Sequence, residues 1–355
     1  MSGSPIRAAE IRAAAVVGTT AWGTTLAVLL ARNGLRVTLL ARSEEEAARL
    51  QADRCNRARL PEAEFPPELT VTADPARLGE AQLVCFVVPA QTMAANARAL
   101  AAAVPVGATL LSASKGIEHD SCRRMTEVLA AALPGHPLAV LSGPNLSHEV
   151  ATGLPGTTVI AASGGPVEAS GEASAELLRA AFHGPALRVY TSDDLVGVEF
   201  GGALKNIVAI AAGMVDGFGF GDNAKAAVIT RGLAEISRLG ATAGAHPLTF
   251  QGLAGMGDLI ATAYSPLSRN RRLGELIAGG LGLEAALADL GETVEGAATI
   301  PGALRLAERL GVEMPVAQGL HGILYGGVAP RDAVTALLER DPKAELSRSG
   351  GAPAS

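Results

Sequence analysis

The sequence has few cysteines and no long apolar segment, and these absences exclude several classes of protein. Among its 355 residues, Cys55, Cys85 and Cys122 are too few and odd in number for a disulfide framework and lack metal-ligand spacing. We therefore expect a reducing, cytoplasmic environment. No segment approaches about 20 uninterrupted apolar residues, and the start MSGSPIRAAEIR carries charges where a signal peptide is apolar. Neither membrane insertion nor export is expected.

Basic clusters and metal-ligand patterns are also absent from the sequence. The formal net charge is −6 and the Lys and Arg residues form no long cluster, which predicts a small-molecule substrate and no nucleic-acid partner. The six histidines show no ligand spacing, so no metal is expected. His148 follows the segment SGP closely, but a single histidine without a partner is more often a surface residue than a catalytic one.

Short apolar segments separated by turns or helical stretches fill the first half of the chain. They are AAAVV, RVTLLA, LTVTA, LVCFVVP, TLLSAS, LAVLSGP, TTVIAAS and LRVYT. This alternation predicts an α/β domain with a largely parallel, doubly wound sheet. From Asp193 to Leu338 the apolar residues recur at helical spacing, which predicts an all-α domain. We expect domains at 1–192 and 193–342, followed by a disordered tail at 343–355 because ELSRSGGAPAS has no apolar face.

The segment VVGTTAWGTT (16–25) is typical of the turn that binds a dinucleotide, but it lacks one glycine. In the spacing G-x-G-x-x-G, Gly18 and Gly23 hold the first and third positions, and Thr20 holds the second, where the backbone approaches the pyrophosphate. The helix that follows offers free N–H groups to an anion. A β-branched residue at a position of positive φ predicts a strained turn and weakened binding. A tight turn without any ligand is the alternative.

The second strand ends at Arg42, where a site for NAD usually carries an acidic residue. An arginine there suits the 2′-phosphate of NADP, and an ordinary surface arginine is the alternative. Glu44, Glu45 and Glu46 follow directly, but Ser43 and Glu46 have the spacing of a capping box. That spacing predicts that these acids lie on the solvated first turn of a helix.

Four later segments carry a resemblance to a known family. They are SASKGIE (112–118), LSGPNLSHEV (141–150), VEFGGALKNIVAIAAGMVDGFGFGDNAKAAVITRGLAEI (198–236) and GLAGMGDLIATAYSPLSRNRRLGE (252–275). Together with the turn G-x-x-x-W-G-T, they resemble, in order, the bacterial-type NAD(P)-dependent glycerol-3-phosphate dehydrogenases. The resemblance implies an N-terminal Rossmann-type domain, an all-α C-terminal domain of the 6-phosphogluconate-dehydrogenase-like kind, and a homodimer. Thr20 departs from it, because the family has glycine there.

The same resemblance implies a set of site residues by position. It makes Lys205 the catalytic acid and base, with Lys115 and Asp258 beside it. For the substrate it implies Lys115, Gly143, Asn206, Ser268, Arg269 and Asn270. With the turn and second strand included, the cofactor residues are Gly18, Thr20, Ala21, Trp22, Gly23, Arg42, Lys115, Ser147, Arg269 and Glu295, and the expected cofactor is NADP in preference to NAD.

The residue types suit this chemistry, although each has a simpler interpretation. Lys205 stands in an apolar segment, where desolvation would lower its pKa towards working pH, but it can instead extend from a buried helix to solvent. Asp258 can orient that lysine or cap a helix. Arg269 begins a basic group suited to phosphate, in which Arg271 and Arg272 fit a solvated helix end.

The function that the resemblance implies is the reversible reduction of dihydroxyacetone phosphate to sn-glycerol 3-phosphate by NAD(P)H, for glycerophospholipid synthesis. One alternative is a related dehydrogenase for another phosphorylated or acidic hydroxy compound. The other is a binding paralogue whose altered turn has lost productive cofactor binding. Retention of Lys115, Lys205, Asp258, Arg269 and Asn270 argues against the second alternative.

Overall fold

The computed structural model describes residues 11–163, 171–291 and 293–333, so the predicted tail and Leu338 lie outside the described residues. The strands are β1 (Ala13–Val17), β2 (Arg36–Leu40), β3 (Cys55–Asn56), β4 (Leu60–Glu64), β5 (Leu69–Thr72), β6 (Leu83–Phe86), β7 (Thr109–Ser112), β8 (Leu138–Ser142), β9 (Gly156–Ala162) and β10 (Leu187–Ser192). The helices are α1 (Ala21–Arg32), α2 (Glu44–Asp53), α3 (Met93–Ala99), α4 (Met125–Ala132), α5 (Ser147–Ala151), α6 (Gly171–Phe182), α7 (Leu195–Gly217), α8 (Gly221–Thr242), α9 (Asp258–Tyr264), α10 (Arg269–Ala278), α11 (Leu283–Leu290), α12 (Glu295–Leu310) and α13 (Pro315–Tyr325).

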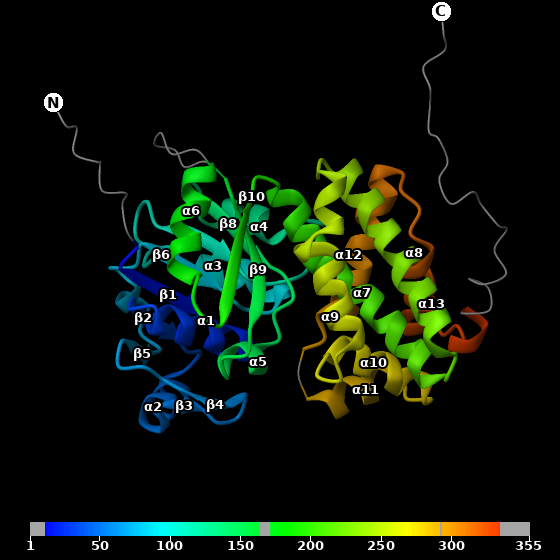
Figure 1. Cartoon of the computed structure of the whole chain (residues 1–355), viewed down its shortest axis with the longest axis horizontal. Coiled ribbons are helices and arrows are strands. Elements are labelled where there is room, and N and C mark those ends of the chain that lie inside the picture. The colour runs from blue at the N-terminus through cyan, green and yellow to red at the C-terminus, as the bar shows by residue number, and fades with distance from the viewer. Residues whose placement is uncertain (1–10, 164–170, 292, 334–355) are drawn as a thin grey trace, which may run out of the picture.

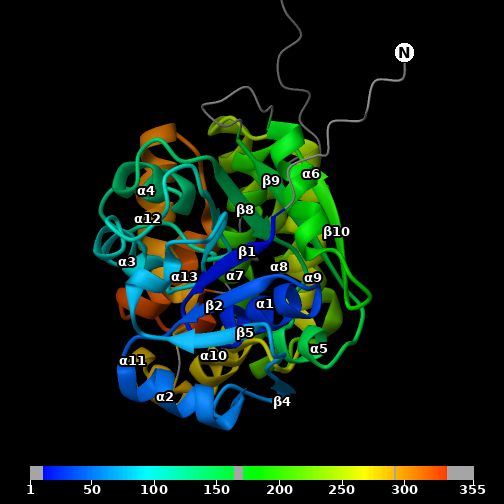
Figure 2. The same cartoon turned by 90° about the vertical axis from the view of Figure 1, so that its left-hand side faces the viewer.

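The first half of the chain forms an eight-stranded sheet with the order β10-β9-β8-β7-β6-β1-β2-β5, and helices cover both of its faces (Figure 1, Figure 2). Neighbouring strands are parallel except for β8 and β9, which are antiparallel. The apolar segments pack into two clusters of buried side chains, one on each face of the sheet. The expected doubly wound, Rossmann-type fold is confirmed.

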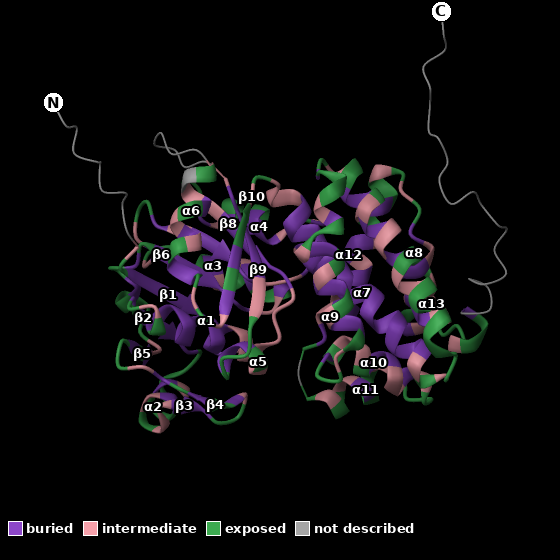
Figure 3. Cartoon of the chain, in the orientation of Figure 1, coloured by how far each residue is buried: buried purple, intermediate pink, exposed green. Residues whose placement is uncertain are grey.

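The second half is helical, as expected, and it is built around α7 (Figure 3). This helix is long and apolar enough to cross a membrane, but 83% of its most apolar window is buried inside the protein. Such burial is typical of the core helix of a soluble fold. Gly202 lets α7 approach β8 closely, because an added Cβ there would lie 2.3 Å from Ser142 Oγ.

The parallel strands bring distant segments of sequence to one edge of the sheet. Because β2, β1, β6, β7 and β8 lie side by side and run in the same direction, their carboxyl ends meet there. The residues that follow these ends are, in spatial order, Arg42, Gly18, Val87, Lys115 and Gly143. In open α/β sheets this edge is where ligands bind.

Candidate active site

A buried cluster of two lysines and one aspartate joins the sheet to the helical half. Lys205 in the middle of α7 and Asp258 at the start of α9 have side chains 8% and 3% exposed, and Lys205 Nζ lies 2.9 Å from Asp258 Oδ1. Lys115, which follows β7, donates to Asp258 Oδ2 at 2.6 Å and to the carbonyl oxygen of Gly143 at 3.0 Å. One carboxylate therefore orients both ammonium groups.

The surroundings of Lys205 favour proton exchange. Burial lowers the pKa of Lys205 to about 8, an effect that Asp258 opposes and Lys115 reinforces. Thr262 accepts a hydrogen bond from Lys205 Nζ and donates to the carbonyl oxygen of Asp258 at 2.7 Å. The alternatives of a lysine extending to solvent and of an aspartate serving only as a helix cap are wrong, because the two charged groups are buried against each other.

Two asparagines connect three helices of the helical half. Asn206, next to Lys205 on α7, accepts a hydrogen bond from Asn270 Nδ2 at 2.9 Å. Asn270 Oδ1 in turn accepts from the backbone N–H of Gly296 at 2.9 Å, at the start of α12. The pair therefore fixes the first turns of α10 and α12 beside α7.

Arg269 opens α10 with an exposed side chain. Ser268 caps this helix by accepting from the backbone N–H of Arg271 at 3.3 Å. The guanidinium of Arg269 donates to the carbonyl oxygen of Thr293 at 2.8 Å, and its charge is among the causes that lower the pKa of Lys205. An exposed cation whose charge acts on the buried Lys205 suits an anionic group of a ligand.

The interpretation as a solvated helix end is wrong for Arg271 and holds for Arg272. Arg271 is not a solvated helix end, because its Nε lies 2.7 Å from Asp216 Oδ2 and its side chain is largely buried. Arg272 is exposed, as expected for a solvated residue. His148 is also partly exposed, and its Nδ1 lies 3.3 Å from Glu62 Oε2.

The expectation of backbone strain at Thr20 is wrong. Its φ of −61° and ψ of 164° are ordinary extended values, and Thr20 is the N-cap of α1. Its hydroxyl accepts from the backbone N–H of Gly23 at 3.0 Å and donates to the carbonyl oxygen of Val87 at 3.2 Å. The turn therefore uses threonine as a helix cap where glycine was expected for its conformational freedom.

The turn nevertheless fits a dinucleotide. Gly18 has φ of +110°, and an added Cβ would lie 2.6 Å from the carbonyl oxygen of Val87, so the chain keeps a space that only glycine permits. Helix α1 begins at Ala21, so the N–H groups of Ala21 and Trp22 have no helical acceptor. Within the described ranges, the buried Trp22 Nε1 and Glu295 Oε2 have no hydrogen-bond partner. Free donors at a helix N-terminus are what a pyrophosphate requires.

Glu295 and Ser147 are the first residues of α12 and α5 and make contacts with different parts of the sheet half. Glu295 Oε1 accepts from the backbone N–H of Ala90 at 3.2 Å, and burial raises the pKa of Glu295 to about 7. The carbonyl oxygen of Ser147 accepts from Thr25 Oγ1 at 3.3 Å, which ties α5 to α1. Ser147 therefore borders the helix that carries the turn, and Glu295 borders the segment that follows β6.

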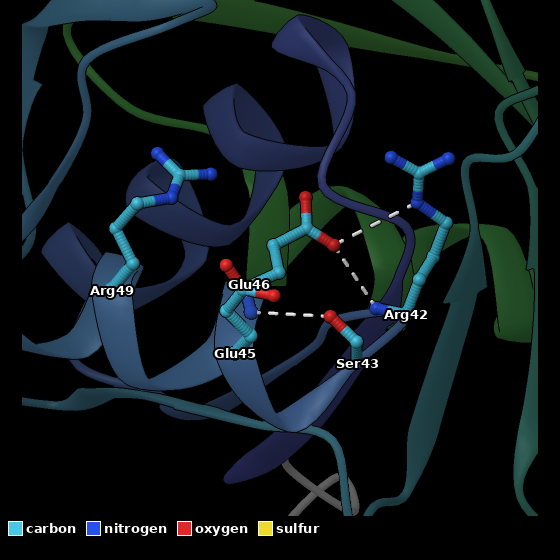
Figure 4. A pocket seen from close by; sticks show the side chains of 5 residues that line it. All are labelled: Arg42, Ser43, Glu45, Glu46 and Arg49. Atoms are coloured by element: carbon cyan, nitrogen blue, oxygen red, sulfur yellow. Dashed lines mark hydrogen bonds and ion pairs between the residues drawn. The ribbon is translucent and has the colours of Figure 1, made fainter.

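At the other end of the sheet edge, a surface pocket of about 390 Å³ is lined by Arg42, Ser43, Glu45, Glu46 and Arg49 (Figure 4). Ser43 caps α2 as expected, accepting from the backbone N–H of Glu46 at 3.2 Å. Glu45 is exposed, but Glu46 is not a solvated acid, because its carboxylate lies against Arg42. The predicted solvated turn is therefore wrong for that residue.

Comparison with known proteins accounts for both halves of this site. The sequence profile described as the N-terminus of NAD-dependent glycerol-3-phosphate dehydrogenase matches residues 13–165, and the profile described as its C-terminus matches residues 194–335. The chain belongs to this family. The resemblance inferred from the five motifs is thus confirmed.

Similar members of the glycerol-3-phosphate dehydrogenase family cover nearly the whole chain. The enzyme of Corynebacterium glutamicum, named glycerol-3-phosphate dehydrogenase (NAD(P)+), is 45% identical over 93% of this chain and 98% of its own. The enzyme of the same name from Geobacter sulfurreducens is 46% identical with the same coverage. The crystal structure of glycerol-3-phosphate dehydrogenase from Coxiella burnetii has a TM-score of 0.87 and 35% identity, covering 93% of this chain and 99% of the other.

Some residues of the site were not predicted from sequence. Thr262 contacts both Lys205 and Asp258, and the only sequence signal for it is its position one helical turn after Asp258. Thr19 in the Gly18 turn donates a hydrogen bond to Glu46 on α2. The sequence gives no signal for this contact, because the two residues lie on separate elements.

Proposed function

We propose that this chain is an NAD(P)-dependent dehydrogenase that interconverts dihydroxyacetone phosphate and sn-glycerol 3-phosphate. The observation that carries the proposal is the buried Lys205, whose pKa of about 8 and contact with Asp258 suit it to exchange a proton with a carbonyl oxygen. Through Asp258 it is linked to Lys115, which follows β7 at the sheet edge that also carries the Gly18 turn. Family membership supports the same reaction.

In this proposal Lys205 Nζ gives its proton to the carbonyl oxygen of the substrate during reduction and takes it back during oxidation. A nicotinamide dinucleotide held by the Gly18 turn would supply or accept the hydride at the neighbouring carbon. Asp258 holds the ammonium group in position, and Thr262 accepts a hydrogen bond from it. Lys115, fixed by Asp258 and the carbonyl of Gly143, adds positive charge where the oxygen becomes negative.

Substrate phosphate is proposed to bind at the first turn of α10. Arg269 supplies the charge, and Ser268, Asn270 and Asn206 supply polar groups around it. A guanidinium gives forked, charge-assisted hydrogen bonds to phosphate, which an unphosphorylated ketone cannot receive. The proposed enzyme therefore selects phosphorylated substrates.

The proposed cofactor contacts follow the sheet edge. The proposed pyrophosphate contacts come from the turn and the start of α1, at Gly18, Thr20, Ala21, Trp22 and Gly23. The nicotinamide end is proposed to lie near Ser147, Lys115, Arg269 and Glu295. The adenosine end is proposed to lie near Arg42. Arg42 favours NADP over NAD, because a guanidinium attracts a 2′-phosphate.

We further propose that the chain works as a homodimer in the cytoplasm and supplies glycerol 3-phosphate for phospholipid synthesis. The proposed division places the cofactor domain at 1–192 and the substrate domain at 193–342. The family resemblance supports the dimer, and a mass measurement in solution tests it. The binding-paralogue alternative loses its main support, because Thr20 caps α1 without strain.

The function is tested by measuring oxidation of NADPH and NADH with dihydroxyacetone phosphate, dihydroxyacetone and a panel of phosphorylated or acidic ketones. Turnover that is fastest with dihydroxyacetone phosphate supports the proposal. Faster turnover of another ketone would favour a related dehydrogenase, and binding of the cofactor without any turnover would favour the paralogue. Parallel titrations of both cofactors without substrate separate these outcomes.

A further inference from the structure

The junction between β2 and α2 contains a tethered acid whose role the reaction does not explain. The side chain of Glu46 is 16% exposed although it stands on the first turn of a surface helix, whereas Arg42 beside it is 79% exposed. Figure 4 shows the Glu46 carboxylate between the guanidinium groups of Arg42 and Arg49. These three charged groups line the same pocket.

Two hydrogen bonds from separate segments hold this carboxylate in place. The buried Thr19, in the Gly18 turn, donates through Oγ1 to Glu46 Oε1 at 2.8 Å. The backbone N–H of Arg42 donates to Glu46 Oε2 at 3.1 Å, and Arg42 Nε lies 3.7 Å from the same oxygen. The carboxylate is therefore fixed to the turn on one side and to the strand end on the other.

The charge of this carboxylate is stabilised in the folded protein. Burial raises the pKa of Glu46, but the Thr19 hydroxyl, the Arg42 amide and the two guanidinium groups lower it by more, so the pKa lies below the usual value. The folded protein therefore favours the charged form of Glu46. The pocket lining as a whole has two cations, Arg42 and Arg49, and two anions, Glu45 and Glu46.

A tethered anion and a mobile anion affect a phosphate differently. Glu45 is exposed, so its side chain can turn away from an arriving phosphate. Glu46 cannot turn away without breaking its bonds to Thr19 and Arg42, so it competes with the phosphate for the Arg42 guanidinium. In sites for NAD a carboxylate after the second strand accepts a ribose 2′-hydroxyl. Glu46 presents a fixed carboxylate to the same end of the sheet from the first turn of α2.

We infer that Glu46, tethered by Thr19, is a specificity-determining residue that limits the advantage of the 2′-phosphorylated cofactor and lets the chain bind NADH as well as NADPH. The inference rests on the proposed dinucleotide binding at the Gly18 turn. Arg42 and Arg49 attract the 2′-phosphate, and the negative charge of Glu46 reduces the affinity that they give it.

The test compares Glu46→Gln with Glu44→Gln. Glu44 is a suitable control because it is an exposed acid on the same helical turn that does not line the pocket. Calorimetric titration gives dissociation constants for adenosine 2′,5′-bisphosphate and for adenosine 5′-monophosphate, which differ only in the 2′-phosphate, and for NADPH and NADH. Effects on the shared 5′-phosphate cancel in the ratio of each pair.

Glu46→Gln is expected to raise the preference for the 2′-phosphorylated member of each pair by about fivefold, since it removes one unit charge at ion-pair distance in a solvated site. Glu44→Gln is expected to change the preference by less than about twofold, because salt screens a more distant exposed charge. An unchanged or reduced preference in Glu46→Gln would overturn the inference. An equal increase in both variants would also overturn it, because general surface charge would then explain the effect.

A second pair of variants tests the tether. Thr19→Val removes the hydroxyl at nearly constant shape and frees the carboxylate, so the preference for the 2′-phosphate should rise by about twofold, whereas Thr19→Ser should leave it unchanged. An unchanged ratio in Thr19→Val would show that the tether does not act. If the wild-type chain binds neither NADPH nor NADH, the proposed function fails and the inference fails with it. If it binds both and the Glu46 variant leaves their ratio unchanged, only the inference fails.

Discussion

The ammonium group of Lys205 is buried in the protein. Desolvation disfavours the charged form, and the partner carboxylate of Asp258 restores part of the loss, so the two protonation states are close in free energy near neutral pH. A lysine in this condition can serve as acid in one direction and base in the other. The neighbouring Thr262 accepts its hydrogen bond without adding charge.

Replacing Lys205 by alanine should lower kcat by at least about 100-fold, because positioned proton transfer typically contributes that much. The dissociation constant for NADPH should change little, because the Gly18 turn and α1 lie outside the altered contacts. Steady-state kinetics and a fluorescence titration measure the two effects. Normal turnover in the variant would exclude Lys205 as the acid-base residue.

The pKa of Lys205 also predicts opposite pH profiles for the two directions. Reduction needs the protonated lysine, so its kcat/KM should fall as pH rises through about 8, and oxidation needs the neutral lysine, so its kcat/KM should rise there. In Asp258→Asn the midpoint should move to lower pH, because the carboxylate raises the pKa of Lys205. A midpoint that is unaffected by this change would assign the titration to another group.

Arg269→Ala should raise KM for dihydroxyacetone phosphate by roughly 10- to 100-fold, since a hydrogen bond to a charged group contributes about 1.5–3 kcal/mol. Arg272→Ala is the control, because Arg272 is an exposed cation on the same helix. Kinetics with dihydroxyacetone phosphate and dihydroxyacetone separate a phosphate effect from a general loss. If both variants discriminate these ketones as the wild type does, the phosphate binds elsewhere.

At the scale of elements, the alternation of apolar segments and helical stretches was sufficient to predict every strand of the large sheet. The hairpin of β3 and β4 was not predicted, because a two-residue strand such as Cys55–Asn56 has no periodicity to detect. The pairing of Lys205 with Asp258 came from the family resemblance, since spacing along the chain cannot show which helices pack together. The prediction of backbone strain at Thr20 was wrong, because the G-x-G-x-x-G pattern does not show whether its second position needs a positive φ or holds a helix cap.

The cap at the start of α1 gives an element-scale prediction. Thr20→Ala removes the acceptor for Gly23 N–H and the donor to Val87, and a lost N-cap costs about 1 kcal/mol. Amide exchange in the first turn of α1 should therefore be about fivefold faster than in the wild type, as hydrogen exchange measured by mass spectrometry would show. Thr20→Ser keeps the hydroxyl and should exchange at nearly the wild-type rate. Equal rates in the alanine and serine variants would show that the cap does not stabilise the turn.

At the scale of the whole molecule, the site depends on how the sheet and the helical half dock. Lys115 comes from the sheet and Asp258 from a helix of the other half, so their 2.6 Å contact exists only in the docked arrangement. A second buried contact crosses the same boundary. Glu199 on α7 accepts hydrogen bonds from the backbone and hydroxyl groups of Thr126, at 2.9 and 2.6 Å, and from the guanidinium of Arg124.

Glu199→Gln should therefore weaken the docking of the two halves more than the same substitution would at an exposed position. An amide has one acceptor oxygen in place of two and directs its NH2 group at donors, so buried N–H and O–H groups are left unsatisfied at a cost of about 1–3 kcal/mol. The matched control is Glu127→Gln, because Glu127 also pairs with Arg124 but lies on α4 itself and is about half exposed, where such a pair contributes less than about 1 kcal/mol. Denaturant unfolding should show the larger loss for Glu199→Gln, and turnover should fall more than NADPH affinity, because the Gly18 turn lies within the sheet half. Equal losses in the two variants would show that this contact does not hold the halves together, and Lys115 with Asp258 would then be the contact to test next.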